Sequence, residues 1–179
     1  MNILLHVCCA PCLIYPLEAL RSKEHNVAGF FYNPNIHPQT EYISRRQAAE
    51  EYAAFAGCRL DVPEYAPEHF FQAVHLRQVP PDRCMRCWSL RLRQTARHAK
   101  ESGFDAFCTT LLVSPYQDQA QLKMLGEDIA SSEGSVFYYE DFRPGFRKAH
   151  AQARAQGIYC QKYCGCLYSQ KERSVQRKT

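Results

Sequence analysis

The chain has 179 residues, of which 46% are hydrophobic and 22% charged, and its formal net charge at pH 7 is +4. This length suits one domain with its own core, and this composition excludes an intrinsically disordered chain. The net charge permits an anionic partner without requiring one.

The sequence also favours one cellular compartment. No apolar run approaches the roughly 18 residues of a membrane-spanning helix, and the first residues lack the basic and apolar regions of a secretory signal. We therefore expect a cytoplasmic protein. Because thiols stay reduced in that compartment, the ten cysteines favour metal binding or redox chemistry over a structural disulfide framework.

The most informative stretch is HVCCAPC at residues 6–12, which follows a short apolar run that we predict as the first strand. Pro11 ends this strand because it lacks the amide donor of a ladder. Cys8, Cys9 and Cys12 are thus expected at the carboxyl end of a strand, where open α/β sheets place their active sites. A single free cysteine is as often structural, but three together favour a binding role.

The rest of the chain alternates between predicted strands and helices. After the first strand, at residues 3–5, strands are predicted over residues 27–32, 60–62, 104–110 and 136–139, and helices over residues 13–25, 40–56, 67–78, 84–102, 114–129 and 144–156. The helix at 114–129 is expected to begin with a capping box formed by Ser114, Pro115 and Gln117. The alternation predicts an α/β fold with a five-stranded, mainly parallel sheet and helices on both faces.

A second thiol motif, Cys84-Met85-Arg86-Cys87, begins one of these helices. A Cys-x-x-Cys at a helix start brings both sulfurs to one side, which serves metal ligation and dithiol chemistry alike. Together with Cys8 and Cys9, this motif makes a four-thiolate set that suits zinc or an iron–sulfur cluster. Vicinal cysteines are poorly suited to one tetrahedral zinc ion, so we favour a [4Fe-4S] cluster.

The C-terminal segment carries Cys160, Cys164 and Cys166. Only Gly165 separates the last two, so a disulfide between them closes a small, strained ring that is easily reduced. That spacing suits a redox-active pair or two metal ligands, and two free thiols are the alternative. The isolated Cys58 and Cys108 are expected to be inert.

Six blocks of the sequence together resemble the epoxyqueuosine reductase QueH family. They are HVCCAPC at 6–12, FYNPNIHP at 31–38, DRCMRC at 82–87, TTLLVSPYQ at 109–117, DFR at 141–143 and YCGCLYS at 163–169. The resemblance implies reduction of the epoxide of epoxyqueuosine, at the tRNA wobble position, to queuosine, the last step of queuosine biosynthesis. It also implies an unidentified electron donor.

The resemblance further assigns residues and a fold. It implies that Cys8, Cys9, Cys84 and Cys87 hold a [4Fe-4S] cluster, and that Cys164 and Cys166 form a redox-active disulfide. It implies a Rossmann-like sheet similar to that of the nucleotide α-hydrolase group, without ATP chemistry because thiols replace the phosphate loop. Residues 1–179 then form a single catalytic domain, with the Cys-rich, basic segment 158–179 packed at the active site.

Two hypotheses concern residues beyond this set. We expect Cys12 to bind an additional iron beside the cluster, and Asp82 to act as a ligand or acid unless it is simply a helix N-cap. For tRNA, Tyr32, Tyr116 and Tyr168 are candidate stacking residues. Candidate phosphate contacts are Arg45, Arg46, Arg91, Arg93, Arg97, Lys171, Arg173, Arg177 and Lys178. The alternative function is a non-catalytic, zinc-stabilised RNA-binding module, in which all cysteines serve structure.

Overall fold

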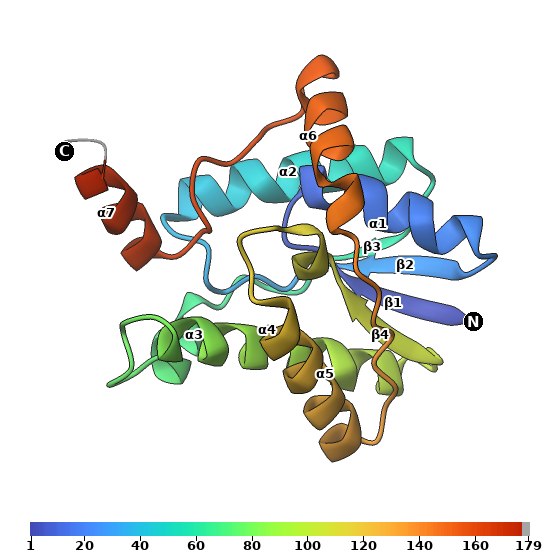
Figure 1. The fold of residues 1–179 in the computed structure, drawn as a ribbon, viewed down its shortest axis with the longest axis horizontal. Helices are drawn as coiled ribbons and strands as arrows, with labels where there is room; N and C mark the ends of the chain where they lie inside the picture. The colour runs from blue at the N-terminus through green and yellow to red at the C-terminus, as the bar shows by residue number, and fades with distance from the viewer. Residues whose placement is uncertain (177–179) are drawn as a thin grey trace.

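The computed structural model describes residues 1–176 and has an α/β fold built on a parallel sheet (Figure 1). The sheet has four strands in the order β3-β2-β1-β4, and all pairs are parallel. Its strands are β1 (Asn2–His6), β2 (Asn26–Phe30), β3 (Leu60–Asp61) and β4 (Ala106–Thr109). Since β1 pairs with β2 on one side and β4 on the other, the segment after β1 leaves the sheet at its centre.

Helices cover both faces of the sheet (Figure 1). One face carries α1 (Ala10–Ser22), α2 (Gln39–Phe55) and α6 (Phe146–Ala155), and the other carries α3 (Pro67–Ala73), α4 (Asp82–Glu101) and α5 (Gln119–Glu133). Short 3-10 turns, η1 (Thr110–Val113) and η2 (Arg143–Gly145), follow β4 and precede α6, and α7 (Leu167–Gln176) lies apart from both layers. The predicted parallel sheet with helices on both faces is confirmed.

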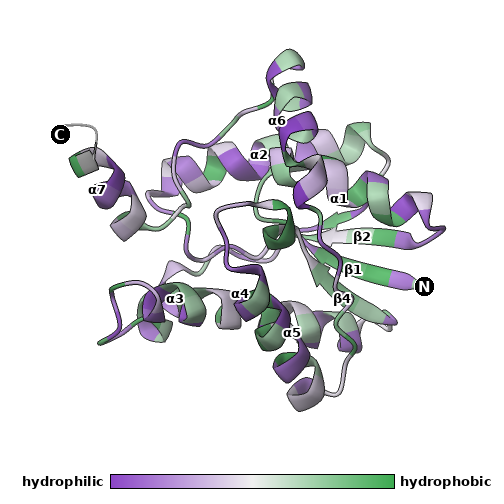
Figure 2. Cartoon of the chain, in the orientation of Figure 1, coloured by the Kyte–Doolittle hydropathy of each residue, from purple (hydrophilic) through white to green (hydrophobic). Residues whose placement is uncertain are grey.

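The core lies between the sheet and these helices. Residues 3–6 of β1 are fully buried, as expected for a strand covered on both faces, and β1 and β2 are mainly hydrophobic along their length (Figure 2). On α4, Trp88, Leu92, Ala96 and Ala99 are buried at helical spacing. None of the helices in the described part of the chain combines the length and apolar character of a membrane span.

The predicted fifth strand at residues 136–139 is wrong. This segment does lie beside β4, because the Phe107 amide donates to the Val136 carbonyl and the Tyr138 amide donates to the Phe107 carbonyl, both at 2.8 Å. Only Phe107 takes part in this pairing, so it amounts to one isolated parallel bridge with Phe137 and not to a ladder. The sheet therefore has four strands.

The capping box predicted at Ser114 is also wrong. Residues 114–117 form a turn, in which the Gln117 amide donates to the Ser114 carbonyl at 3.4 Å. The α5 helix begins later, at Gln119, because Asp118 is the N-cap and its carboxylate accepts from the Gln121 amide at 3.0 Å. The helix is therefore capped by Asp118, which lies closer to its buried residues than Ser114 does.

Other helix ends differ from the prediction. The first helix begins at Ala10 and not at residue 13, because Pro11 is well tolerated in a first turn. The α3 helix ends at Ala73, well before residue 78, and Leu76 beyond it has a positive φ of 62°. The helix α7 was not predicted.

Candidate thiol-lined active site

A cavity of about 340 Å³ opens at the carboxyl edge of β1 and β4. Its lining residues come from α1, α2, α4, η1, α6 and the C-terminal segment: Cys8, Cys12, Arg45, Arg91, Thr110, Leu111, Ser114, Tyr116, Gln117, Phe146, His150, Gln161, Lys162, Tyr163, Cys164 and Arg173. A larger cavity of about 610 Å³ lies between α2 and the chain after α6, but no thiol lines it. The chemistry-bearing residues therefore meet at the smaller cavity.

Cys8, Cys9 and Cys12 form the first thiol group. Cys8 follows β1, Cys9 is the N-cap of α1, and Cys12 lies in the first turn of that helix. Their sulfur atoms all lie within 4.8 Å of one another, and the Cys8 and Cys9 sulfurs are 3.7 Å apart. Three convergent soft donors suit a metal ion that prefers thiolates.

The surroundings of this group favour the negatively charged thiolate form of Cys8. Hydrogen bonds with Cys12 and Cys9 hold the pKa of Cys8 well below its usual range, and the same bond with Cys8 raises the pKa of Cys12. The Thr110 hydroxyl also donates to the Cys8 sulfur at 3.3 Å. Behind the group, burial lowers the pKa of His6 to about 3, so this histidine is neutral at pH 7.

Cys84 and Cys87 lie on α4, close to Cys164 and Cys166. Cys87 and Cys166 are both buried in a small cluster with Phe70, and the nearby Cys166 raises the pKa of Cys84, after the larger effect of desolvation. Cys164 lines the cavity together with Cys8 and Cys12. All ten cysteines are free thiols in this structure. The thiols thus form two groups, and Cys84 and Cys87 are not gathered with Cys8 and Cys9.

Arg91 lies between the two thiol groups. It is only 2% exposed, and its Nε donates to the Cys87 carbonyl at 3.3 Å. Its charge lowers the pKa of both Cys87 and Cys164, although desolvation raises each of them overall. Its Nη2 atom is buried and has no hydrogen-bond partner among residues 1–176, and the side chain lines the cavity. A buried guanidinium of this kind favours anionic or polar groups in the cavity.

Comparison with known proteins gives this site a family. A family model described as "Epoxyqueuosine reductase QueH" matches residues 3–172. The chain belongs to the epoxyqueuosine reductase QueH family. The match includes every thiol discussed above and most of the C-terminal segment.

Curated relatives and a solved structure agree with this assignment. Epoxyqueuosine reductase QueH of Thermotoga maritima is 36% identical, over 96% of this chain and 92% of the relative. The QueH of Dehalococcoides mccartyi is 34% identical, over 96% and 94%. The structure of a predicted subunit of a tRNA methyltransferase from Methanocaldococcus jannaschii has a TM-score of 0.55 at 13% identity, over 85% of this chain and 74% of that one. That likeness concerns the fold alone, so the nucleotide α-hydrolase assignment stays a prediction.

Several residues that the sequence suggested for this QueH site lie elsewhere. Asp82 is the first residue of α4, not its N-cap, and pairs with Arg77 at 3.2 Å outside the thiol cavity. Arg93 and Arg97 form ion pairs with Glu133 of α5. Cys58 and Cys108 are buried apart from both thiol groups, and burial raises the pKa of Cys108 to about 12.

Some of the candidate tRNA contacts line the cavity, and others are buried or paired elsewhere. Tyr116 is 84% exposed and lines the cavity, as does Arg173. Tyr32 is buried, and Tyr168 lies against the Arg83 guanidinium. Of the remaining candidates, Arg45 and Arg91 are buried, Arg46 pairs with Glu50, Lys171 is exposed, and Arg177 and Lys178 lie outside the described residues.

Some site residues were missed by sequence reasoning. Gln161 donates from Nε2 to the Cys9 sulfur at 2.9 Å, and His150 and Lys162 line the cavity. None of these residues belongs to a recognisable motif or spacing. Their position depends on how α6 and the C-terminal segment pack over the sheet, so the sequence alone carries no signal for them.

Proposed function

We propose that this chain reduces the epoxide of epoxyqueuosine, at the wobble position of tRNA, to the alkene of queuosine, the last step of queuosine biosynthesis. The supporting observation is a family match over residues 3–172 in a chain whose thiols border one cavity at the carboxyl edge of the sheet. The protein is thus an oxidoreductase that acts on tRNA.

The size of the cavity supports a single nucleoside as the group that enters it. A volume of about 340 Å³ is in the range of small-molecule sites and cannot hold folded RNA. The modified nucleotide therefore has to leave the stack of the anticodon loop, as in other enzymes that act on a base. Tyr116 packs edge-on against the half-buried Phe146 with ring centroids 5.9 Å apart, and the exposed Tyr116 ring offers a stacking surface.

Three side chains that line the cavity carry a polar atom whose hydrogen bond is not used within the described part of the protein. Among the described residues, Arg91 Nη2, His150 Nε2 and Gln161 Oε1 are buried and have no partner. The arginine nitrogen is a donor, the histidine nitrogen serves as donor or acceptor, and the glutamine oxygen is an acceptor. This set suits the hydroxyl and epoxide oxygens of the substrate. Lys162 and Arg173 line the same cavity and are exposed, so they are placed to contact backbone phosphates.

The chemistry of the reaction determines how many electrons the epoxide must receive. Removing an epoxide oxygen as water, with formation of an alkene, consumes two electrons and two protons. Oxidation of the Cys164 and Cys166 dithiol to a disulfide releases two electrons and two protons, so the two half-reactions balance. An external electron donor, which the sequence does not identify, then returns the disulfide to the dithiol. We propose this redox role for the pair because Cys164 lines the cavity.

We also propose that Cys8, Cys9, Cys84 and Cys87 hold a [4Fe-4S] cluster. Four thiols are the donors that such a cluster needs: Cys8 and Cys9 belong to a group of thiols within 4.8 Å, and Cys84 and Cys87 lie on α4, where the charge of Arg91 acts on both Cys87 and Cys8. When bound, such a cluster supplies electrons one at a time. Within the protein, the positive charge of Arg91 lowers the pKa of Cys87, although desolvation raises it overall.

An additional metal beside the cluster remains part of the proposal. Its support is Cys12, whose sulfur lies with those of Cys8 and Cys9. The proposed contribution of Asp82 has no such support, because its carboxylate pairs with Arg77. A metal with an open position acts as a Lewis acid toward oxygen.

The proposal extends to the organisation and location of the protein. Residues 1–179 act as a single catalytic domain, and the segment 158–179 packs at the active site. Contacts of Tyr159, Tyr163 and Glu172 with the body support this for the described part of the segment. A tRNA substrate and reactive thiols both suit the cytoplasm.

One experiment tests cofactor and reaction together. The protein is purified without oxygen, its absorption spectrum and iron and sulfide content are measured, and it is incubated with reductant and tRNA bearing epoxyqueuosine. We expect a brown protein with about four or more irons per chain that forms queuosine. A colourless zinc protein that stays inert after reconstitution with iron and sulfide would contradict the proposal and favour the RNA-binding module.

A further inference from the structure

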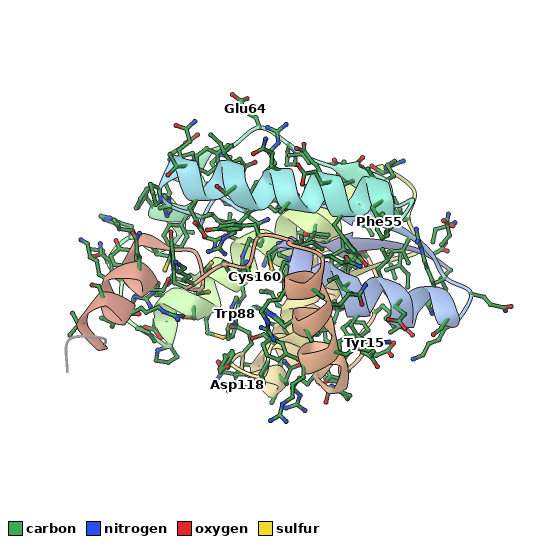
Figure 3. All side chains as sticks on the ribbon, turned by 90° about the horizontal axis from the view of Figure 1, so that it is seen from above. Tyr15, Phe55, Glu64, Trp88, Asp118 and Cys160 are labelled. Carbon is green, nitrogen blue, oxygen red and sulfur yellow. The ribbon has the colours of Figure 1, made fainter. Side chains whose placement is uncertain are left out.

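Two buried arginines hold the C-terminal segment, defined here as residues 158–176, against the body of the protein. Arg45 on α2 is 2% exposed, and Arg83 on α4 is 3% exposed. Seen from above, the chain that carries Cys160 runs from α6 alongside α2 toward α7 (Figure 3). A buried guanidinium is costly unless its donors are satisfied, so the partners of these two side chains reveal their role.

Arg45 binds the backbone next to the redox pair. Its Nη1 donates to the Cys164 carbonyl and its Nη2 to the Tyr163 carbonyl, both at 3.0 Å, while Nε donates to Glu41 at 2.8 Å. The guanidinium also lies over the Tyr163 ring, 5.3 Å from its centroid. Three acceptors around one planar fork are a pattern that arginine satisfies and lysine does not.

The loop before α2 also binds the segment around Cys164 and Cys166. The His37 amide donates to the Gly165 carbonyl at 2.9 Å, and the Tyr163 hydroxyl donates to the His37 carbonyl. Gly165 has a φ of 139°, and a Cβ at this position would lie 3.1 Å from Asn35 Nδ2 and 3.3 Å from Arg45 Nη1. Glycine between the two cysteines therefore allows the segment to lie close to the loop and to Arg45.

Arg83 holds the segment on the other side of the pair. It forms a bidentate ion pair with Glu172 of α7, at 2.8 and 2.9 Å, and donates to the Gln78 carbonyl at 2.9 Å. The Tyr168 ring centroid is 5.3 Å from its guanidinium carbon. Cys166 lies between these anchors, at the start of α7, where its sulfur accepts from the Ser169 amide at 3.4 Å.

We propose that Arg45 and Arg83 are positioning residues that seat the Cys164–Cys166 pair at the thiol cavity. This inference rests on the proposed function. Arg45 fixes the backbone at Cys164, which lines the cavity with Cys8 and Cys12, and Arg83 fixes the helix that follows Cys166, which packs with Cys87. Neither arginine is a phosphate contact in this arrangement, because the donors that we describe bind protein groups.

The test compares these arginines with exposed neighbours on the same helices. The variants are Arg45→Gln, Arg45→Lys and Glu172→Gln, and the controls are Glu51→Gln on α2 and Arg86→Gln on α4, both at exposed positions. Glu172→Gln loosens the Arg83 anchor from the segment side, where the side chain is 49% exposed, so it does not disturb the core. Two readouts are measured: amide hydrogen exchange in residues 158–169, and kcat and KM on tRNA bearing epoxyqueuosine.

Loss of an anchor should release the segment but not the body. We expect exchange in 158–169 to increase at least ~10-fold in all three variants, with no change in β1, since bonds to charged groups are the stronger ones. We expect kcat to fall about 10-fold or more and KM to change by less than about threefold, because the other cavity walls remain. Arg45→Lys should behave like Arg45→Gln because its ammonium lacks the planar fork.

Each outcome separates this inference from the proposed function. Exchange and kcat at control levels in Arg45→Gln and Glu172→Gln would overturn the inference, as would full recovery in Arg45→Lys. If wild-type protein is inert on the tRNA, the proposed reaction fails, and the exchange readout still tests whether the two arginines hold the segment.

Discussion

Thr110 and Cys8 are joined by two hydrogen bonds across the centre of the sheet edge. The Cys8 amide donates to the Thr110 hydroxyl at 3.0 Å, and that hydroxyl donates to the Cys8 sulfur at 3.3 Å. Cys8 follows β1 and Thr110 follows β4, the neighbouring parallel strand. One side chain thus aligns the ends of two strands and orients the first thiol.

We expect Thr110→Val to destabilise the protein. Valine has the shape of threonine, which is fully buried here, but leaves the partly buried Cys8 amide without its acceptor, which costs about 1–3 kcal/mol of the free energy of unfolding. Thr110→Ser keeps the hydroxyl and should lose less. Urea denaturation measures the difference, and a loss in Thr110→Val no larger than that in Thr110→Ser would contradict this role of the hydroxyl.

Removal of Cys12 should reduce metal binding. Its sulfur lies within 4.8 Å of those of Cys8 and Cys9, so Cys12→Ala removes one of three convergent donors. We expect a loss of about one metal ion per chain and of reductase activity. Iron analysis of protein purified without oxygen checks this, with Cys58→Ala as the control at a buried cysteine outside the group. Wild-type iron content and activity in Cys12→Ala would exclude the additional metal.

Single substitutions in the redox pair should separate turnover from metal content. Neither Cys164→Ser nor Cys166→Ser can form the disulfide, so we expect activity to fall on the order of 100-fold or more in both, with iron content unchanged. Cys160→Ser tests the third cysteine of the segment, whose sulfur contacts only the Ile158 carbonyl among the hydrogen bonds described, and should remain active. Loss of iron in the first two variants would instead indicate that these thiols are metal ligands.

His37 should make the protein sensitive to acid. Burial lowers its pKa, and its ring lies against Phe70 and Phe71 at 5.3 and 4.7 Å. The unfolded chain, with a histidine pKa near 6.5, then binds the proton more readily, so the free energy of unfolding falls as pH drops below about 6.5, by up to ~1.4 kcal/mol per pH unit.

His37→Gln removes this contribution, so its free energy of unfolding should change less steeply between pH 6.5 and the lower folded-state pKa. Denaturation at several pH values checks the slope, and His75→Gln at an exposed position is the control. A difference between wild type and His37→Gln that is constant with pH would contradict the expectation.

Binding of tRNA should weaken with salt through two residues at the cavity. Lys162 and Arg173 line it and are exposed, and each phosphate contact adds about 0.7–0.9 to the slope of log affinity against log salt. We expect Lys162→Gln and Arg173→Gln to reduce this slope by about 1 each. Filter binding at several salt concentrations measures it. Arg59→Gln, which breaks an exposed pair with Asp61, should keep the wild-type slope.

The position of the first thiol group could be predicted, because an apolar run followed by cysteines and a proline determines a strand end. The number of strands could not, since residues 136–139 are β-rich but only Phe107 pairs with them. Ser114 and Asp118 are both residue types that cap helices and lie only four positions apart, so packing of α5 decides between them. The sequence shows that Arg45 and Arg83 are charged. It does not show that they are buried, because their burial depends on where the C-terminal segment lies.

The first thiol group and the Cys164–Cys166 pair belong to parts of the chain that are synthesised at different times. Cys8, Cys9 and Cys12 follow the central strand, whereas Cys164 and Cys166 lie in a segment that is translated after the whole sheet and is held through two arginines of the body. Since translation runs from the N-terminus, the residues of the sheet and its first thiols leave the ribosome before the last wall of the cavity is made. This order leaves the first thiol group open to an incoming metal until the segment closes over it.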